Sequence, residues 1–177
     1  MTDVAILYSE PEVRAKIKEL GQIIAGDYAG EELLVVGILK GAVVFMSDLV
    51  REIDLPLQID FMEVSSYGAS TVSSGEVRIL KDLSYALEGK NVLVVEDIID
   101  TGLTLKYISS ILRKRGPKSL KICCLLDKPS RRKADIKPDY VGFSIEDHFV
   151  VGWGLDYAGY YRNYPAICIL DPAVYNK

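Results

Sequence analysis

The sequence has few of the residues that build metal or redox centres, and it lacks long apolar segments. One histidine, three cysteines and one tryptophan occur among 177 residues. This leaves neither a zinc-type ligand set nor an even cysteine framework. The short, interrupted apolar runs predict neither a transmembrane helix nor a signal peptide. Cys123 and Cys124 lie in an apolar run and are expected to be buried thiols in a reducing, cytoplasmic setting.

An excess of basic residues is also absent. The formal net charge is −4, so the composition favours neither a nucleic-acid nor a membrane partner. An anionic substrate would therefore be held by a few placed donors rather than by a general positive field. Hydrophobic residues make up 49% of the chain, which is enough for one sizeable core. We expect residues 1–177 to form a single domain.

Alternating apolar runs and helical patterns predict an α/β fold with a central parallel sheet flanked by helices. Continuously apolar runs indicate strands that are buried on both faces. These runs lie at 33–39, 91–95 and 120–126. Further strands are expected at 58–64, 76–80, 140–145 and 166–170. Helices are expected at 9–25, 43–53 and 105–115, the first with the capping-box spacing of Ser9 and Glu12.

The segment from Ser65 to Gly75 is small and polar, with too few apolar side chains to pack. We therefore expect a mobile loop there, joining strands 58–64 and 76–80 into a long antiparallel hairpin.

The clearest functional signal follows the apolar run 91–95, where residues 96–104 read EDIIDTGLT. Ligands of open α/β sheets bind outside the carboxyl ends of the strands, and the start of the next helix offers free N–H groups to an anion. Thr101 and Thr104 add hydroxyl groups, and Gly102 allows close approach of the backbone. The segment predicts a cradle for one phosphate. It is not a Walker loop, because the glycine-rich run and its lysine are missing.

Carboxylates beside this cradle would repel a phosphate unless they have partners of their own. Glu96 and Asp97 suit ribose hydroxyls and a hydrated Mg²⁺, and Asp100 at the helix entrance could accept a proton. The alternative is that Asp100 and Thr101 only cap the helix, while the acidic pair forms a solvated turn. An apolar strand that ends in two acids, followed at once by DTGxT, favours the functional interpretation.

At this point the sequence resembles a known family. The run VVEDIIDTG at 94–102 resembles the signature with which type I phosphoribosyltransferases bind 5-phosphoribosyl 1-pyrophosphate (PRPP), and more narrowly that of the hypoxanthine-guanine phosphoribosyltransferases. The likeness runs from Leu33 to Leu170. LKG at 39–41 resembles the pyrophosphate loop, and LLDK at 125–128 the segment that presents a purine-binding lysine. PDYVGF at 138–143 through FVVGWGLDY at 149–157 resembles the purine-binding hood.

The resemblance implies the type I phosphoribosyltransferase fold, with a flexible loop and a small hood formed by the N-terminal segment and roughly residues 128–170. It also implies roles toward PRPP. The 5′-phosphate would be held by Thr101, Gly102, Leu103 and Thr104, next to Asp100. Glu96 and Asp97 would bind the ribose hydroxyls and, with Asp156, Mg²⁺. Lys40, Gly41 and Arg162 would meet the pyrophosphate. The family carries a non-proline cis peptide between the residues that match Leu39 and Lys40.

Toward the purine, the resemblance makes Asp100 the catalytic base for the N7 proton and Lys128 the donor to the 6-oxo group. Phe149 would stack on the base, the Val150 backbone would read its edge, and Asp156 would lie beside it. Without the family, Lys128 would be an ordinary surface lysine and Phe149 a core residue.

The resemblance also assigns two loop residues, and three other positions differ from those of relatives. Ser66 and Tyr67 would lead closure of the loop over the pyrophosphate. Leu103 and His148 stand where some relatives have lysine, and Trp153 where relatives often have tyrosine. The loss of a lysine at Leu103 removes a charge but leaves the backbone cradle.

The implied activity is transfer of the phosphoribosyl group from PRPP to hypoxanthine and/or guanine, with Mg²⁺, in a homodimer or homotetramer. Three alternatives stay open: a PRPP-binding regulator without catalysis, a transferase for another base such as xanthine, orotate or uracil, and a nonenzymatic Mg²⁺-nucleotide module. The presence of both Asp100 and Lys128 favours an active purine enzyme.

Overall fold

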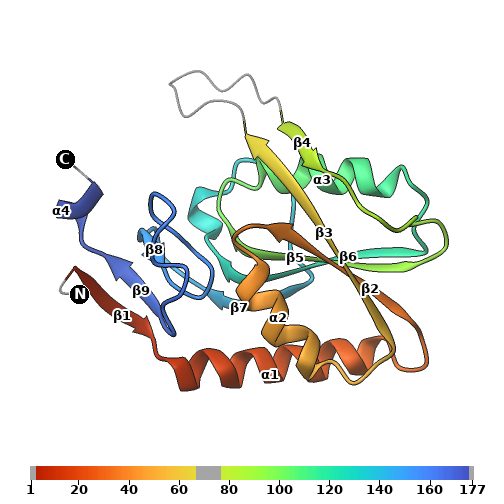
Figure 1. The fold of residues 1–177 in the computed structure, drawn as a ribbon, viewed down its shortest axis with the longest axis horizontal. Coiled ribbons are helices and arrows are strands. Elements are labelled where there is room, and N and C mark those ends of the chain that lie inside the picture. The colour runs from red at the N-terminus through yellow and green to blue at the C-terminus, as the bar shows by residue number, and fades with distance from the viewer. Residues whose placement is uncertain (1–2, 67–76, 176–177) are drawn as a thin grey trace.

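The computed structural model of this chain describes residues 3–66 and 77–175, and there it has the α/β architecture expected from the sequence (Figure 1). The main sheet has six strands in the order β4-β3-β2-β5-β6-β7. Their bounds are β2 Leu33–Leu39, β3 Leu57–Ser66, β4 Val77–Lys81, β5 Asn91–Ile99, β6 Ser119–Asp127 and β7 Tyr140–Ser144. Neighbouring strands are parallel except β3 and β4, which form the predicted antiparallel hairpin.

Both faces of this sheet are covered, which explains why its central strands are apolar throughout. Successive side chains of a strand point to opposite faces. In β2, Val35 packs in the core cluster that contains α1 (Glu10–Asp27) and α2 (Val43–Glu52). Val36 packs in a second cluster, which contains α3 (Leu103–Arg113). The parallel sheet therefore lies between two cores, and its carboxyl edge stays open between them.

A second, three-stranded sheet lies beside the first, in the order β1-β9-β8 with antiparallel pairing. Its strands are β1 Val4–Tyr8, β8 Val150–Val151 and β9 Ile167–Leu170, and a short helix, α4 (Pro172–Tyr175), follows. Figure 1 shows β1 and β9 side by side, with both chain ends in this part of the molecule. The sequence did not predict β1, whose partner β9 is far away in the chain and whose Ile6 is largely exposed.

Several predicted boundaries are wrong in an informative way. β5 runs on to Ile99, so Glu96 and Asp97 lie inside the strand rather than after it. The strand extends this far because its parallel pairing with β6 continues to Ile99, which lies opposite Asp127. Helix α3 begins at Leu103 and ends at Arg113, two residues ahead of the predicted bounds.

The start of the predicted mobile loop is also corrected. Ser65 and Ser66 belong to β3 and pair with Arg78 and Val77 of β4, so Ser66 is a strand residue. Tyr67 and the rest of that loop lie outside the described residues. The Leu39–Lys40 peptide is cis, as in the family that the sequence resembles. None of the helices described is long and apolar enough to cross a membrane.

Candidate active site

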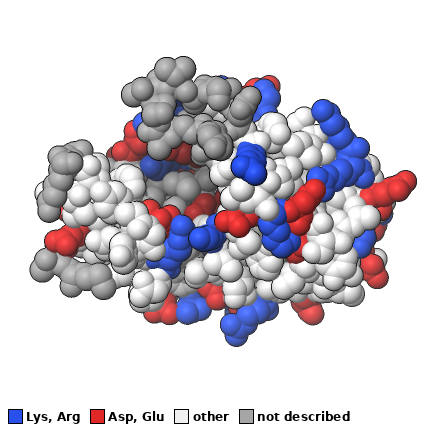
Figure 2. Space-filling model, turned by 45° about the horizontal axis from the view of Figure 1, so that its top comes forward, with Lys and Arg blue, Asp and Glu red and all other residues white. Residues whose placement is uncertain are grey.

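Six of the residues that the sequence analysis selected meet in a pocket of about 230 Å³ at the carboxyl ends of β5 and β6. Segments far apart in the sequence form its walls: the end of β5, the residue that follows β6, and the chain on either side of β8. The lining residues are Asp97, Ile98, Asp100, Lys128, Phe149, Val150, Leu155 and Asp156. Ile98 and Leu155 were not predicted as site residues, and they add apolar surface for a flat ligand. Figure 2 shows red and blue side chains interspersed around a hollow in this region.

The acidic pair of β5 is electrostatically crowded. Burial raises the pKa of Glu96 well above its ordinary value, and the charge of Asp97 raises it further. Burial also raises the pKa of Asp97, while a hydrogen bond from the Ile98 N–H (2.7 Å) and the positive charge of Arg162 oppose that shift. Two carboxylates in this position favour a bound cation or hydroxyl donors, which would relieve their repulsion.

The segment predicted to hold a phosphate is supported by contacts with residues 132–136. Gly102 precedes α3 with φ +77°, and a Cβ there would lie 2.7 Å from Ile136 and 2.9 Å from the Arg132 side chain. Only glycine fits this position without displacing those neighbours. The Thr101 carbonyl accepts hydrogen bonds from the backbone N–H groups of residues 133 and 134, at 2.9 and 3.0 Å. Arg132 Nε donates to the Asp100 carbonyl at 3.2 Å, so the residues 100–104 are held in place while the start of α3 faces outward.

The residues predicted to bind pyrophosphate differ in the partners that the structure gives them. Gly41 lies directly against the Asp97 carboxylate, because a Cβ at Gly41 would collide with it. Lys40 next to it is exposed, and its side chain has no hydrogen bond or ion pair with any described residue. Arg162 forms an ion pair with Asp156 at 2.8 Å and donates to the Gly154 carbonyl at 2.6 Å. Within the described part of the chain, the Lys40 side chain is thus unpaired, and Arg162 has a carboxylate partner.

The predicted purine residues lie around the same pocket. The Lys128 side chain is almost completely buried. Phe149 is 39% exposed, its ring stacking on Tyr175 with centroids 5.0 Å apart and meeting Tyr157 edge to face. Val150 is buried.

Sequence reasoning missed several charged and aromatic neighbours of these residues. Arg131 Nε lies 3.0 Å from Asp100 Oδ1, and Arg131 Nη1 lies 3.4 Å from Asp147 Oδ2. Arg132 and Tyr175 were also missed. The two arginines follow Lys128 within four residues, and that basic run was the available signal.

The acidic residues of the site can be compared with the ligand sets of metal ions. No group of three or more His, Cys, Asp or Glu side chains suited to a metal occurs among the described residues. Glu96, Asp97 and Asp156 therefore do not form a closed metal site on their own. Mg²⁺ typically takes only one or two carboxylates and completes its shell with water and substrate phosphates. Asp97 and Asp156, which line one pocket, fit that kind of partial site.

A mainly parallel sheet with a predicted phosphate cradle after one strand, an acidic pair in that strand and a buried lysine after the next is typical of enzymes that act on sugar phosphates. The family model of the phosphoribosyl transferase domain matches residues 3–158, and the chain belongs to this family.

Individual relatives are more specific than the family model. The chain is 58% identical to the hypoxanthine-guanine phosphoribosyltransferase of Bacillus subtilis over 172 residues, covering 97% of this chain and 96% of the relative. A crystal structure of a hypoxanthine phosphoribosyltransferase from Staphylococcus aureus superposes with a TM-score of 0.96 at 53% identity, covering 99% and 96% of the two chains. The hypoxanthine phosphoribosyl transferase of Trypanosoma cruzi gives a TM-score of 0.94 at 41% identity, covering 99% and 96%.

Proposed function

We propose that this chain transfers the 5-phosphoribosyl group of PRPP to a 6-oxopurine, hypoxanthine or guanine, and so salvages purines as nucleoside 5′-monophosphates. One observation carries the proposal. A single pocket gathers an acidic strand end, the carboxylate before a phosphate cradle, a buried lysine and a partly exposed aromatic ring. These are the groups that a phosphorylated sugar and a planar, carbonyl-bearing base require. The close relatives named as hypoxanthine-guanine phosphoribosyltransferases support the choice of base.

PRPP would bind along the carboxyl edge of β2 and β5. The backbone N–H groups of residues 101–104 would hold the 5′-phosphate, with the positive end of the α3 dipole behind them. Glu96 and Asp97 would accept hydrogen bonds from the ribose hydroxyls. Lys40, the Gly41 backbone and Arg162 would meet the pyrophosphate, and a guanidinium suits phosphate oxygens because it can bind two of them at once.

The purine would enter between Phe149 and the acidic edge. Lys128 would donate a hydrogen bond to the 6-oxo group, Phe149 would stack on the ring and the Val150 backbone would read its edge. The purine N9 then attacks the anomeric carbon, the bond from that carbon to the pyrophosphate breaks through an oxocarbenium-like state, and Asp100 accepts the N7 proton. Relatives that lack catalysis would be expected to lose Asp100 or Lys128, and this chain has both.

Members of this family use a metal ion with PRPP, and we propose that it is Mg²⁺ here. Asp97, with Glu96 and Asp156 nearby, would hold it through carboxylate oxygens and water. The bound ion would supply charge neutralisation for the departing pyrophosphate. Asp156 would have to share its carboxylate with Arg162, its partner at 2.8 Å.

Three further points stay predictions. The N-terminal segment, which carries β1, and roughly residues 128–170 would form the hood of one domain. The chain would assemble as a homodimer or homotetramer. It would work in the cytoplasm, a setting consistent with three buried cysteines, none of them in a disulfide.

The test is an assay of the full chain with PRPP, Mg²⁺ and one base at a time: hypoxanthine, guanine, xanthine, adenine, orotate and uracil. We expect nucleoside monophosphate and pyrophosphate in equal amounts with hypoxanthine or guanine. EDTA should abolish the activity and excess Mg²⁺ should restore it. PRPP binding without turnover of any base would favour a regulator, and undiminished turnover in EDTA would contradict the metal role.

A further inference from the structure

Lys128 is a buried lysine with one ion-pair partner in the described part of the chain. Its side chain is 8% exposed, and its amino group lies 3.6 Å from Asp147 Oδ1. Among the described residues, that side chain has no other ion pair and no hydrogen bond. A lysine ammonium sits on a flexible four-carbon stem, so its direction depends on what attracts it. Here that attraction comes from Asp147.

Asp147 is itself held by a second cation. Its other carboxylate oxygen, Oδ2, lies 3.4 Å from Arg131 Nη1, and Arg131 Nε lies 3.0 Å from Asp100 Oδ1. One carboxylate thus lies between the buried lysine and the arginine that contacts Asp100. The four charges alternate in sign from Lys128 to Asp100, so each has an opposite charge as its neighbour.

The backbone brings these side chains together independently of their charges. The Lys128 N–H donates to the Ile99 carbonyl at 3.0 Å, which places the lysine beside the residue that precedes Asp100. The Ile145 N–H donates to the Asp127 carbonyl at 2.9 Å, which places the segment that carries Asp147 beside Lys128. The arrangement is therefore fixed by the ends of β5, β6 and β7 and not by the ion pairs alone.

We propose that Asp147 is a positioning residue for purine recognition, whose carboxylate directs the Lys128 ammonium into the pocket while Arg131 holds that carboxylate and links it to Asp100. The inference rests on the proposed function. Asp147 does not line the pocket, so it acts through Lys128 and not on the substrate. An ammonium has three donors, so Lys128 can face Asp147 and still donate to a 6-oxo group.

A purely structural ion pair would behave differently. Asp147 is 52% exposed and Arg131 49% exposed, and pairs of this kind contribute little to folding stability. A structural role would therefore leave both stability and kinetics nearly unchanged. A positioning role predicts an effect confined to the purine.

The experiment compares Asp147→Asn, Asp147→Glu and a matched control, Glu146→Gln. Glu146 is the preceding carboxylate, 89% exposed, and it lies 3.5 Å from His148. Asp147→Asn should raise the purine KM about fivefold or more, as expected for groups coupled in one network. The PRPP KM and the melting temperature should stay at wild-type values. Asp147→Glu should recover most of the loss, and Glu146→Gln should match the wild type.

A second comparison tests whether Asp147 acts through Lys128. In a Lys128→Ala background, Asp147→Asn should cause no further rise in the purine KM. Fully additive effects, an equal rise in the PRPP KM, or a wild-type purine KM in active Asp147→Asn would overturn the inference. Failure of the proposed function would be seen separately, as a wild-type chain that turns over no purine.

Discussion

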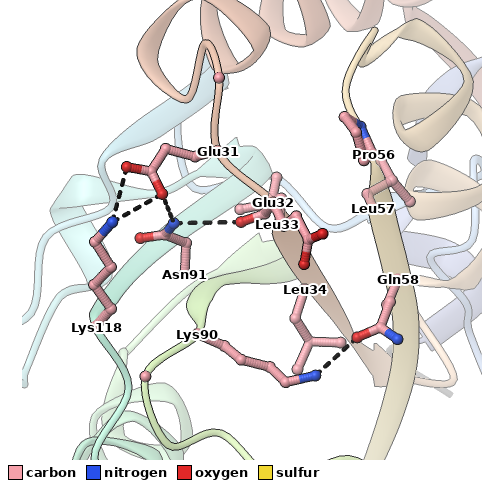
Figure 3. A pocket seen from close by; sticks show the side chains of 12 residues that line it. Glu31, Glu32, Leu33, Leu34, Pro56, Leu57, Gln58, Lys90, Asn91 and Lys118 are labelled. Carbon is pink, nitrogen blue, oxygen red and sulfur yellow. Dashed lines mark hydrogen bonds and ion pairs between the residues drawn. The ribbon is translucent and has the colours of Figure 1, made fainter.

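The two ends of the parallel sheet both carry a pocket, and they differ in how their polar groups are satisfied. The pocket at the amino ends of β2, β3 and β5 is the larger one, about 460 Å³ (Figure 3). There Glu31 accepts hydrogen bonds from Lys118 at 2.8 Å and from Asn91 at 3.2 Å. Lys90 donates to Gln58 at 2.8 Å. Three of the four charged side chains that line this pocket, Glu31, Lys90 and Lys118, therefore have partners within it.

The carboxyl end has half that volume, and its pairing differs. The charged lining residues Asp100, Lys128 and Asp156 pair with side chains that do not themselves line the pocket. The acidic pair Glu96 and Asp97 has raised pKa values, and the side chain of Lys40 has no partner among the described residues. A crowded acidic pair and an unpaired lysine side chain, rather than cavity size, therefore distinguish the candidate functional end of this sheet. Substitutions at the two ends should accordingly change different quantities.

The largest effect is expected at the carboxyl end, from Asp100→Asn. Asparagine keeps the size and the capping ability of aspartate, so the phosphate cradle should survive. It cannot accept the N7 proton, and loss of a general base typically lowers the rate by about 10²–10⁴-fold. We expect kcat to fall by that range while PRPP binding, measured by calorimetry, changes little. Equal loss of PRPP binding would make Asp100 a structural residue instead.

Lys128→Ala should have a smaller effect at the same end. It removes the donor to the 6-oxo group, at a cost of about 1–3 kcal/mol in purine binding. The purine KM should rise accordingly, while the PRPP KM stays constant. Stability should change little, because the carboxylate left behind, Asp147, is half exposed to water. A parallel fall in PRPP affinity would place Lys128 elsewhere in the site.

The fold and the candidate site also show which features can be predicted from sequence. Strands such as β2 and β6 are recognisable because a continuous apolar run is a local property that reflects two buried faces. The phosphate cradle is local as well, since residues 100–104 follow one another. The ion pairs that link Arg131 to Asp100 and Asp147 join segments that meet only in the fold. Local patterns could not reveal them, just as they could not reveal β1.

The carboxyl end of β5 shows the same limit of local sequence patterns within one strand. The apolar pattern stops at Val95, so the strand was expected to stop there as well. The structure continues it to Ile99 because backbone pairing with β6 does not depend on side-chain polarity. An acidic pair inside a strand is therefore positioned more rigidly than the sequence suggested.

At the amino end, Asn91→Ala should lower stability and leave catalysis unchanged. Asn91 is 7% exposed; its amide donates to the Glu32 carbonyl at 3.3 Å and accepts from the Ser119 hydroxyl at 2.8 Å. Unsatisfied partners of a buried amide cost about 1–3 kcal/mol. In a chain of this length, that lowers the melting temperature by about 2–4 °C per kcal/mol. Altered kcat or KM in the folded variant would contradict the division between the two ends, and Gln58→Ala, which removes only an exposed hydrogen bond, is the matched control.

The smallest effect is expected from the ion pair between Lys118 and Glu31, and it should depend on pH. The hydrogen bond from Lys118, followed by that from Asn91, lowers the pKa of Glu31 below its ordinary value. A carboxyl group with a lowered pKa in the folded state contributes stability above its unfolded pKa, about 4.3 for glutamate. That contribution is lost as the pH falls through the lower, folded value. Both side chains are about half exposed, so water and salt screen the pair.

Lys118→Met should therefore reduce the urea midpoint slightly near neutral pH, by less than Asn91→Ala does, and hardly at all once Glu31 is protonated in both states. Added salt should shrink the difference at neutral pH, because it screens the wild-type pair. The kinetic constants should match those of the wild type, since the pair lies at the end of the sheet opposite the candidate active site. A variant with altered kcat would show that the amino-end pocket influences the reaction, and the contrast between the two ends would then fail.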